Sequence, residues 1–150
     1  MLDGVEAVLP VADNRKAVAS LYLLHNGIPD LNAWPVQFAR FANGSYSWRG
    51  VEMTLTGVIT KVGGVYQLVA NAERPAVTLE SLNRADKVQL DRMGNTVNPL
   101  PEEEASAYDR LVASAAALVI DTAVSVTGPI RQTSSGFFLE VRQFTIDRKT

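Results

Sequence analysis

The densest run of chemically active side chains in the sequence is Glu102, Glu103 and Glu104, directly after Pro101. Adjacent carboxylates can act as general acid and base in catalysis. A proline followed by acidic residues is also the ordinary beginning of a helix, because proline suits the first helical position and carboxylates stabilise the positive end of the helix dipole. We interpret the run as a helix start and predict no catalytic residue in it.

The other chemically active residue types are scarce. His25 is the one histidine, and the chain has no cysteine, which excludes disulfides, thiolate metal sites and any site that needs two imidazoles. The pair Gly63-Gly64 lacks the spacing and the lysine of a phosphate-binding P-loop. We therefore expect no metal and no cofactor. An enzyme, or a domain of one, stays an alternative to a binding protein.

Net charge restricts the function further. The 14 basic residues are outnumbered by 16 acidic ones, for a net charge of −2. Duplex-binding proteins gain much of their affinity from Lys and Arg side chains that contact phosphates, so the net charge does not favour that class of protein.

No apolar run approaches the ~20 residues of a membrane-spanning helix. The start of the chain lacks the regions of a signal peptide. We expect a cytoplasmic protein, or an exported one whose signal peptide is absent from this chain.

The first fifty residues predict a β-hairpin and a short helix. Apolar and polar residues alternate over 5–11, and residues 17–24 are apolar on both faces. Trp34, Phe38 and Phe41 then recur at helical spacing within residues 30–42. This aromatic stripe either docks a partner protein or packs on its own hairpin, and we favour packing because such stripes are usually core.

The rest of the chain predicts five strands and one helix. Strands are expected over residues 51–59, 65–70, 76–82, 122–130 and 136–146. Gly63-Gly64 predicts the turn between the first two, and the composition of residues 91–100 predicts a loop. Tyr108, Leu111 and Val119 would lie on one apolar face of the helix that starts at Pro101. The last strand changes phase, which a β-bulge near Arg142 would reconcile.

Two segments echo each other: Leu55-Thr56-Gly57-Val58-Ile59 and Val126-Thr127-Gly128-Pro129-Ile130. Each precedes a glycine and an aromatic strand. With the order strand, strand, strand, helix, strand, strand, residues 50–148 resemble an OB-fold, a five-stranded Greek-key barrel. We predict a mainly β (α+β) fold, with a hairpin–helix extension over 1–49 and an OB-like barrel over 50–150. Gly57 would let the first strand bend.

A second resemblance concerns the beginning of the chain. The segment Gly4-Val5-Glu6-Ala7-Val8, followed by a strand and a helix, resembles the latter half of a heavy-metal-associated, ferredoxin-like domain. The Cys-x-x-Cys motif with which that family binds metal is absent, so the resemblance implies no metal site here.

The resemblance to OB-folds implies a ligand face on strands two and three, flanked by the loops between strands one and two and strands four and five. Mapped onto this sequence, the face includes Lys61, Tyr66, Gln67, Thr78, Arg131, Gln132 and Phe138. Tyr66 and Phe138 would stack on bases, and Lys61 and Arg131 would contact phosphates. In the competing interpretation, both aromatic rings are barrel core and both cations are solvated.

These observations predict a non-enzymatic binding or assembly module. A protein partner is preferred because of the mild acidity of the chain and the aromatic residues over 34–41. A single-stranded nucleic acid or an oligosaccharide on the OB face is the alternative.

Overall fold

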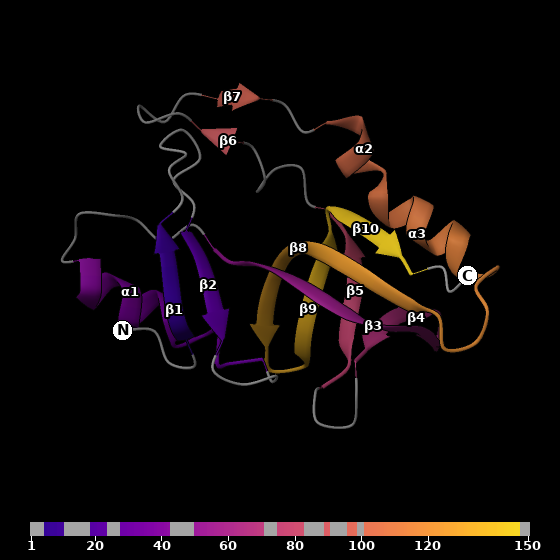
Figure 1. Cartoon of the computed structure of the whole chain (residues 1–150), viewed down its shortest axis with the longest axis horizontal. Helices are drawn as coiled ribbons and strands as arrows, with labels where there is room; N and C mark the ends of the chain where they lie inside the picture. Colours follow the sequence, from indigo (N-terminus) through magenta and orange to yellow (C-terminus); the bar gives the residue numbers. More distant parts are fainter. Residues whose placement is uncertain are drawn as a thin grey trace. The chain divides into compact units, whose positions relative to one another are not determined.

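The computed structural model describes residues 5–10, 19–23, 28–42, 50–70, 75–82, 89–90, 96–98 and 101–147, which belong to two compact units (Figure 1). The first unit contains β1 (Val5–Pro10), β2 (Ala19–Leu23), α1 (Trp34–Ala42), β6 (Gln89–Leu90) and β7 (Thr96–Asn98). The second contains β3 (Glu52–Val62), β4 (Val65–Val69), β5 (Val77–Ser81), α2 (Glu102–Ala105), α3 (Ala107–Ala115), β8 (Ala123–Thr133), β9 (Gly136–Val141) and β10 (Gln143–Ile146). None of the described helices is long and apolar enough to cross a membrane.

In the first unit, β1 and β2 form the antiparallel hairpin that the sequence predicts. The helix predicted within residues 30–42 is α1, and Pro35 lies in its first turn, where a missing N–H removes no helical hydrogen bond.

β6 and β7 pair with each other, although a loop is predicted over 91–100. Strands of two and three residues are too short to show a period-two pattern. The predicted boundary between residues 49 and 50 stays a prediction.

The second unit is a closed barrel. Its strands follow the order β3–β4–β5–β9–β8, and β8 pairs back onto β3. Every neighbouring pair is antiparallel except β5 and β9, which run parallel with Val77 opposite Phe137. The helices α2 and α3 come between the third and fourth barrel strands in the sequence. This order and these directions are those of an OB-like Greek key, so the predicted fold is confirmed.

Two glycines allow the barrel to close. Residues 52–58 of β3 pair with β8, and residues 58–62 pair with β4. At this changeover, a Cβ on Gly57 would lie 2.5 Å from the carbonyl oxygen of Val69. A Cβ on Gly128 of β8 would overlap the carbonyl oxygen of Glu140. Both members of the sequence echo therefore place a glycine where a neighbouring backbone approaches closely.

The last barrel strand is interrupted at Arg142, which separates β9 from β10. Leu139 pairs with Ile130, whereas Gln143 pairs with Thr127. The step from 139 to 143 on one strand thus matches the step from 130 to 127 on the other, which leaves one extra residue. This is the predicted β-bulge, and it places Phe144 opposite the buried Val126.

The single helix predicted from Pro101 is two helices, divided at Ser106. The Ser106 hydroxyl donates a hydrogen bond to the carbonyl oxygen of Glu102 at 2.8 Å. Leu111 of α3 is buried and Tyr108 is half-buried, as expected. Val119 does not lie on the same face as Leu111 and Tyr108, because α3 ends at Ala115 and tight turns follow. Val119 is 79% exposed. The predicted apolar face is therefore one turn too long.

Candidate functional site

Four of the sequence-predicted ligand residues lie in one row on the outside of the barrel. Inward positions are marked by buried residues such as Leu68, Leu79 and Leu139, and residues at the alternate positions face outward. Gln67 lies opposite Thr78, Thr78 lies opposite Phe138, and Phe138 lies opposite Arg131. We call this set, Gln67, Thr78, Phe138 and Arg131, the outer row.

The other three predicted residues lie on the inward alternation. Lys61 and Tyr66 are opposite each other near the tip of the β3–β4 hairpin, and the Lys61 Nζ atom is 5.4 Å from the centre of the Tyr66 ring, a cation–π contact. Gln132 lies opposite Phe137. Tyr66 and Phe138 thus belong to opposite sides of the sheet. The structure does not bring the predicted set together on one face.

Arg131 is already engaged by protein groups. Its two terminal nitrogens donate to Glu80 Oε2 at 2.7 Å and to Glu80 Oε1 at 2.8 Å, a bidentate pair. The guanidinium carbon also lies 4.7 Å from the centre of the Phe138 ring. The hydrogen bonds to Glu80 raise the pKa of Arg131 above its ordinary value. A phosphate at this position would have to displace Glu80, which opposes nucleic-acid binding here.

Beside the outer row, the β3–β4 hairpin presents valines to solvent. Val62 and Val65 lie opposite each other and are 59% and 43% exposed. Val58 and Val69 form a second, half-buried pair on the same side. We call these four residues the valine ladder. The sequence analysis does not identify it, although one signal is present: residues 58–62 and 65–69 carry apolar side chains at both alternations.

The outer surface of the other half of the barrel is polar. The Thr54 and Thr127 hydroxyls lie 2.7 Å apart, and those of Thr56 and Ser125 lie 2.6 Å apart, so both pairs are hydrogen-bonded. Each of these hydroxyls is already hydrogen-bonded to another one, and the surrounding residues are polar and exposed. This surface therefore lacks the apolar character of the valine ladder.

The predicted docking stripe lies on α1. Trp34 is 1% exposed, and Phe38 is half-buried. The Phe41 side chain lies outside the described residues. The docking role of this stripe stays a prediction. In the described part of the chain, no three Asp, Glu or His side chains gather in a way that could hold a metal ion.

No protein-family model and no curated protein matches the chain. Among solved structures, the chain is similar to one in the S. pombe Stn1–Ten1 complex, with 16% sequence identity and a TM-score of 0.36, over 68% of this chain and 64% of that one. A likeness at this level says nothing about function. The class of protein, a chain with an OB-like barrel, rests on the strand order above. The resemblance to heavy-metal-associated domains is not shown by any comparison.

Proposed function

We propose that the chain is a non-enzymatic protein-binding module, which holds its partner against the outer row and the valine ladder. One observation carries the proposal. Val62 and Val65 project into solvent from the outward alternation of the barrel strands, the alternation that also carries Arg131 and its partner Glu80.

An apolar centre beside an arginine and an aromatic ring is the composition of a protein interface. Burying the exposed parts of Val62 and Val65 under a partner would contribute about 1 kcal/mol each, given about 25 cal/mol per Å² of apolar surface. Phe138 and Arg131 would lie at the polar side of this contact, with the guanidinium stacked on the ring. The strands supply a rigid surface, so little order has to be gained on binding.

A single-stranded nucleic acid is the second candidate, favoured by two aromatic rings that each carry a cation, Lys61 over Tyr66 and Arg131 over Phe138. Such proteins combine stacking rings with a basic groove. The two pairs lie on opposite alternations of the strands, however, and Glu80 holds Arg131. A protein partner therefore agrees better with the geometry. No observation favours an oligosaccharide over either.

The proposal is tested by affinity purification from the source cells with the wild-type chain and with the double variant Val62→Lys, Val65→Lys. The matched control is Gln143→Lys, Thr145→Lys, which adds the same charge at exposed positions of β10. We expect one partner to be enriched by the wild type and by the control, and to bind the purified valine variant at least about tenfold more weakly in calorimetry, equivalent to ~1.4 kcal/mol. Circular dichroism must show both variants folded.

Retention of every partner by the valine variant would contradict the proposal. The nucleic-acid alternative is tested in parallel by fluorescence anisotropy with labelled single-stranded oligonucleotides at about 50 and 200 mM salt. Micromolar binding that falls steeply with salt, and that the valine variant keeps, would replace the protein-binding proposal with this alternative.

A further inference from the structure

The connection between α3 and β8 carries the two most exposed large apolar side chains among the described residues. Val119 is 79% exposed, and Ile120 is 88% exposed. They belong to residues 116–122, which we call the α3–β8 loop. Single exposed apolar residues are common on protein surfaces, but Val119 and Ile120 are adjacent and line one depression together with Leu118 and Ile146.

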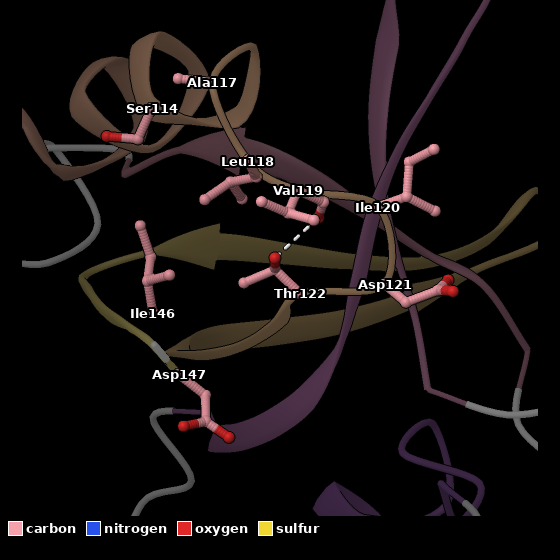
Figure 2. A pocket seen from close by; sticks show the side chains of 9 residues that line it. All are labelled: Ser114, Ala117, Leu118, Val119, Ile120, Asp121, Thr122, Ile146 and Asp147. Atoms are coloured by element: carbon pink, nitrogen blue, oxygen red, sulfur yellow. Dashed lines mark hydrogen bonds between the residues drawn. The ribbon is translucent and has the colours of Figure 1, made fainter. Parts of the chain in front are cut away.

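The loop is held in place by its own hydrogen bonds. The Thr122 backbone N–H donates to the carbonyl oxygen of Val119 at 3.1 Å, and the Thr122 hydroxyl donates to the same oxygen at 2.6 Å (Figure 2). Asp121 reverses the chain with a φ of 66°, in the left-handed region that aspartate tolerates better than most residues. The loop thus presents Val119 and Ile120 in a defined geometry.

A depression of about 550 Å³ lies between this loop and the end of β10. Figure 2 shows Leu118 and Ile146 on two sides of it, with Asp121 and Asp147 at its margin. The backbone N–H of Asp147 donates to the carbonyl oxygen of Ala123 at 2.8 Å, which fixes the end of β10. The two aspartates are its charged lining residues, and no described lysine or arginine lines it.

Apolar walls with two carboxylates at the margin determine what would fit. We propose that this depression is a second docking site, which takes a segment of a partner protein with an Ile or Leu side chain next to a Lys or Arg. The apolar side chain would cover Val119, Ile120 and Leu118, and the base would lie between Asp121 and Asp147. A second copy of the chain is a poorer occupant, because the chain itself has a net charge of −2.

This inference does not depend on the proposed function, because no residue of the loop belongs to the outer row or the valine ladder. If both sites act, the barrel joins two proteins, which is what an assembly module requires. The α3–β8 loop would then set which second partner is accepted, since a carboxylate at the margin rejects an acidic segment.

The test uses the full chain and an array of twelve-residue peptides that combine two Leu or Ile residues with flanking Lys or Arg. A matched array carries Glu in place of each base. The best binders are then measured by fluorescence anisotropy against the wild type, Ile120→Ser, Asp121→Asn and Asp147→Asn. The control is Val36→Ser, which removes an exposed apolar side chain from α1, and Val62→Ser reports whether the peptides bind to the valine ladder instead.

We expect basic peptides to bind the wild type at least about tenfold more tightly than their acidic counterparts do. Ile120→Ser should bind the basic peptides about tenfold more weakly than the wild type, and each aspartate variant about threefold more weakly. Val36→Ser should bind like the wild type. Equal binding of the acidic peptides, no binding by any basic peptide, or unchanged binding by Ile120→Ser would overturn the proposal. Loss of binding in Val62→Ser alone would overturn the proposal and assign the peptides to the valine ladder instead. Sedimentation that shows a dimer abolished by Ile120→Ser would assign the loop to a second copy of the chain.

Discussion

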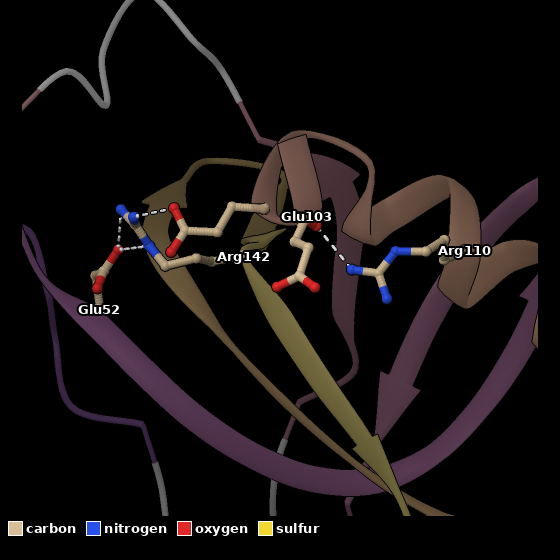
Figure 3. A network of polar contacts seen from close by, with 5 residues as sticks. Glu52, Glu103, Arg110 and Arg142 are labelled. Carbon is tan, nitrogen blue, oxygen red and sulfur yellow. Dashed lines mark hydrogen bonds and ion pairs between the residues drawn. The ribbon is translucent and has the colours of Figure 1, made fainter. Parts of the chain in front are cut away.

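The guanidinium of Arg142 donates from Nε to Oε1 of Glu52 at 2.8 Å, although the two residues are 90 positions apart in the chain (Figure 3). A terminal nitrogen of Arg142 lies 2.7 Å from the same oxygen, and the other donates to Glu104 Oε2 at 3.0 Å. Glu52 begins β3, Glu104 lies in α2 and Arg142 is the bulge residue. One side chain therefore connects three separate parts of the barrel.

Replacing Arg142 should weaken the barrel. We expect Arg142→Ala to lower the free energy of unfolding by about 1–2 kcal/mol. This is the contribution of charge-assisted hydrogen bonds, reduced because the Glu52 side chain is half exposed to solvent. Urea denaturation measures the loss. Arg110→Ala is the comparison, because Arg110 donates within its own helical region, to the carbonyl oxygen of Glu103 at 2.7 Å. Its contact to β10 is a cation–π contact, 5.6 Å from the guanidinium carbon to the centre of the Phe144 ring, so its loss should cost less than that of the ion pairs of Arg142. An Arg142→Ala effect no larger than that of Arg110→Ala would show that the long-range connection contributes nothing.

The glycines of the sequence echo should not tolerate alanine. Gly128→Ala forces the added methyl group into the Glu140 carbonyl, and Gly57→Ala forces it against that of Val69. We expect Gly128→Ala to lose about 3 kcal/mol or more, since a buried backbone group cannot move aside as a side chain can. At Gly63 an added Cβ meets no atom, and only its φ of 58° opposes it, so Gly63→Ala should lose about 1 kcal/mol. Thermal unfolding ranks the three, and an equal loss at Gly63 and Gly128 would contradict the close approach.

Stability should fall at alkaline pH through Tyr108. Burial, followed by the neighbouring Tyr66, raises the pKa of Tyr108 above its ordinary value of 10.0. The folded state therefore favours the neutral phenol. The contribution of the neutral Tyr108 phenol to stability is fully present below pH 10 and is lost as the pH rises through the raised pKa of the folded state. In urea denaturation over this range, Tyr108→Phe should lose less stability with pH than the wild type. Parallel curves for the two proteins would show that Tyr108 has no such role.

The pair of Arg131 and Glu80 should contribute little to folding. Their side chains are 48% and 33% exposed, and exposed ion pairs are worth about 0.2–1 kcal/mol. A double-mutant cycle with Arg131→Met and Glu80→Gln should give a coupling energy in that range, which falls at high salt. A coupling well above it that persists in high salt would mean that the pair is a structural element of the barrel, and not a feature of its binding surface.

The strand order and the bulge could be predicted because both leave a mark in the sequence. Period-two alternation locates β3, the Gly63-Gly64 turn places β4 after it, and the change of phase between Leu139 and Phe144 reports one extra residue. The end of α3 leaves no such mark. Val119 continues the apolar spacing of Leu111, and only the tight turns after Ala115 remove it from that face.

The candidate site was less predictable than the fold, because it depends on which side of the sheet each residue faces. The Gly63-Gly64 turn sets the register that places Lys61 opposite Tyr66, and this alternation separates them from Phe138. The engagement of Arg131 by Glu80 joins residues 51 positions apart in strands that are not neighbours in the sheet. A single sequence holds no local sign of such a contact.

The grouping of β6 and β7 with the first unit, between β5 and α2 in the sequence, has a practical consequence. The polypeptide therefore leaves the second unit after β5 and returns to it before α2. A fragment that starts at Gly50 would therefore keep a piece of the first unit and lack the rest of it. To isolate the barrel, residues 88–99 have to be replaced by a short linker as well, and a protease that cuts only near residue 50 would not release it cleanly.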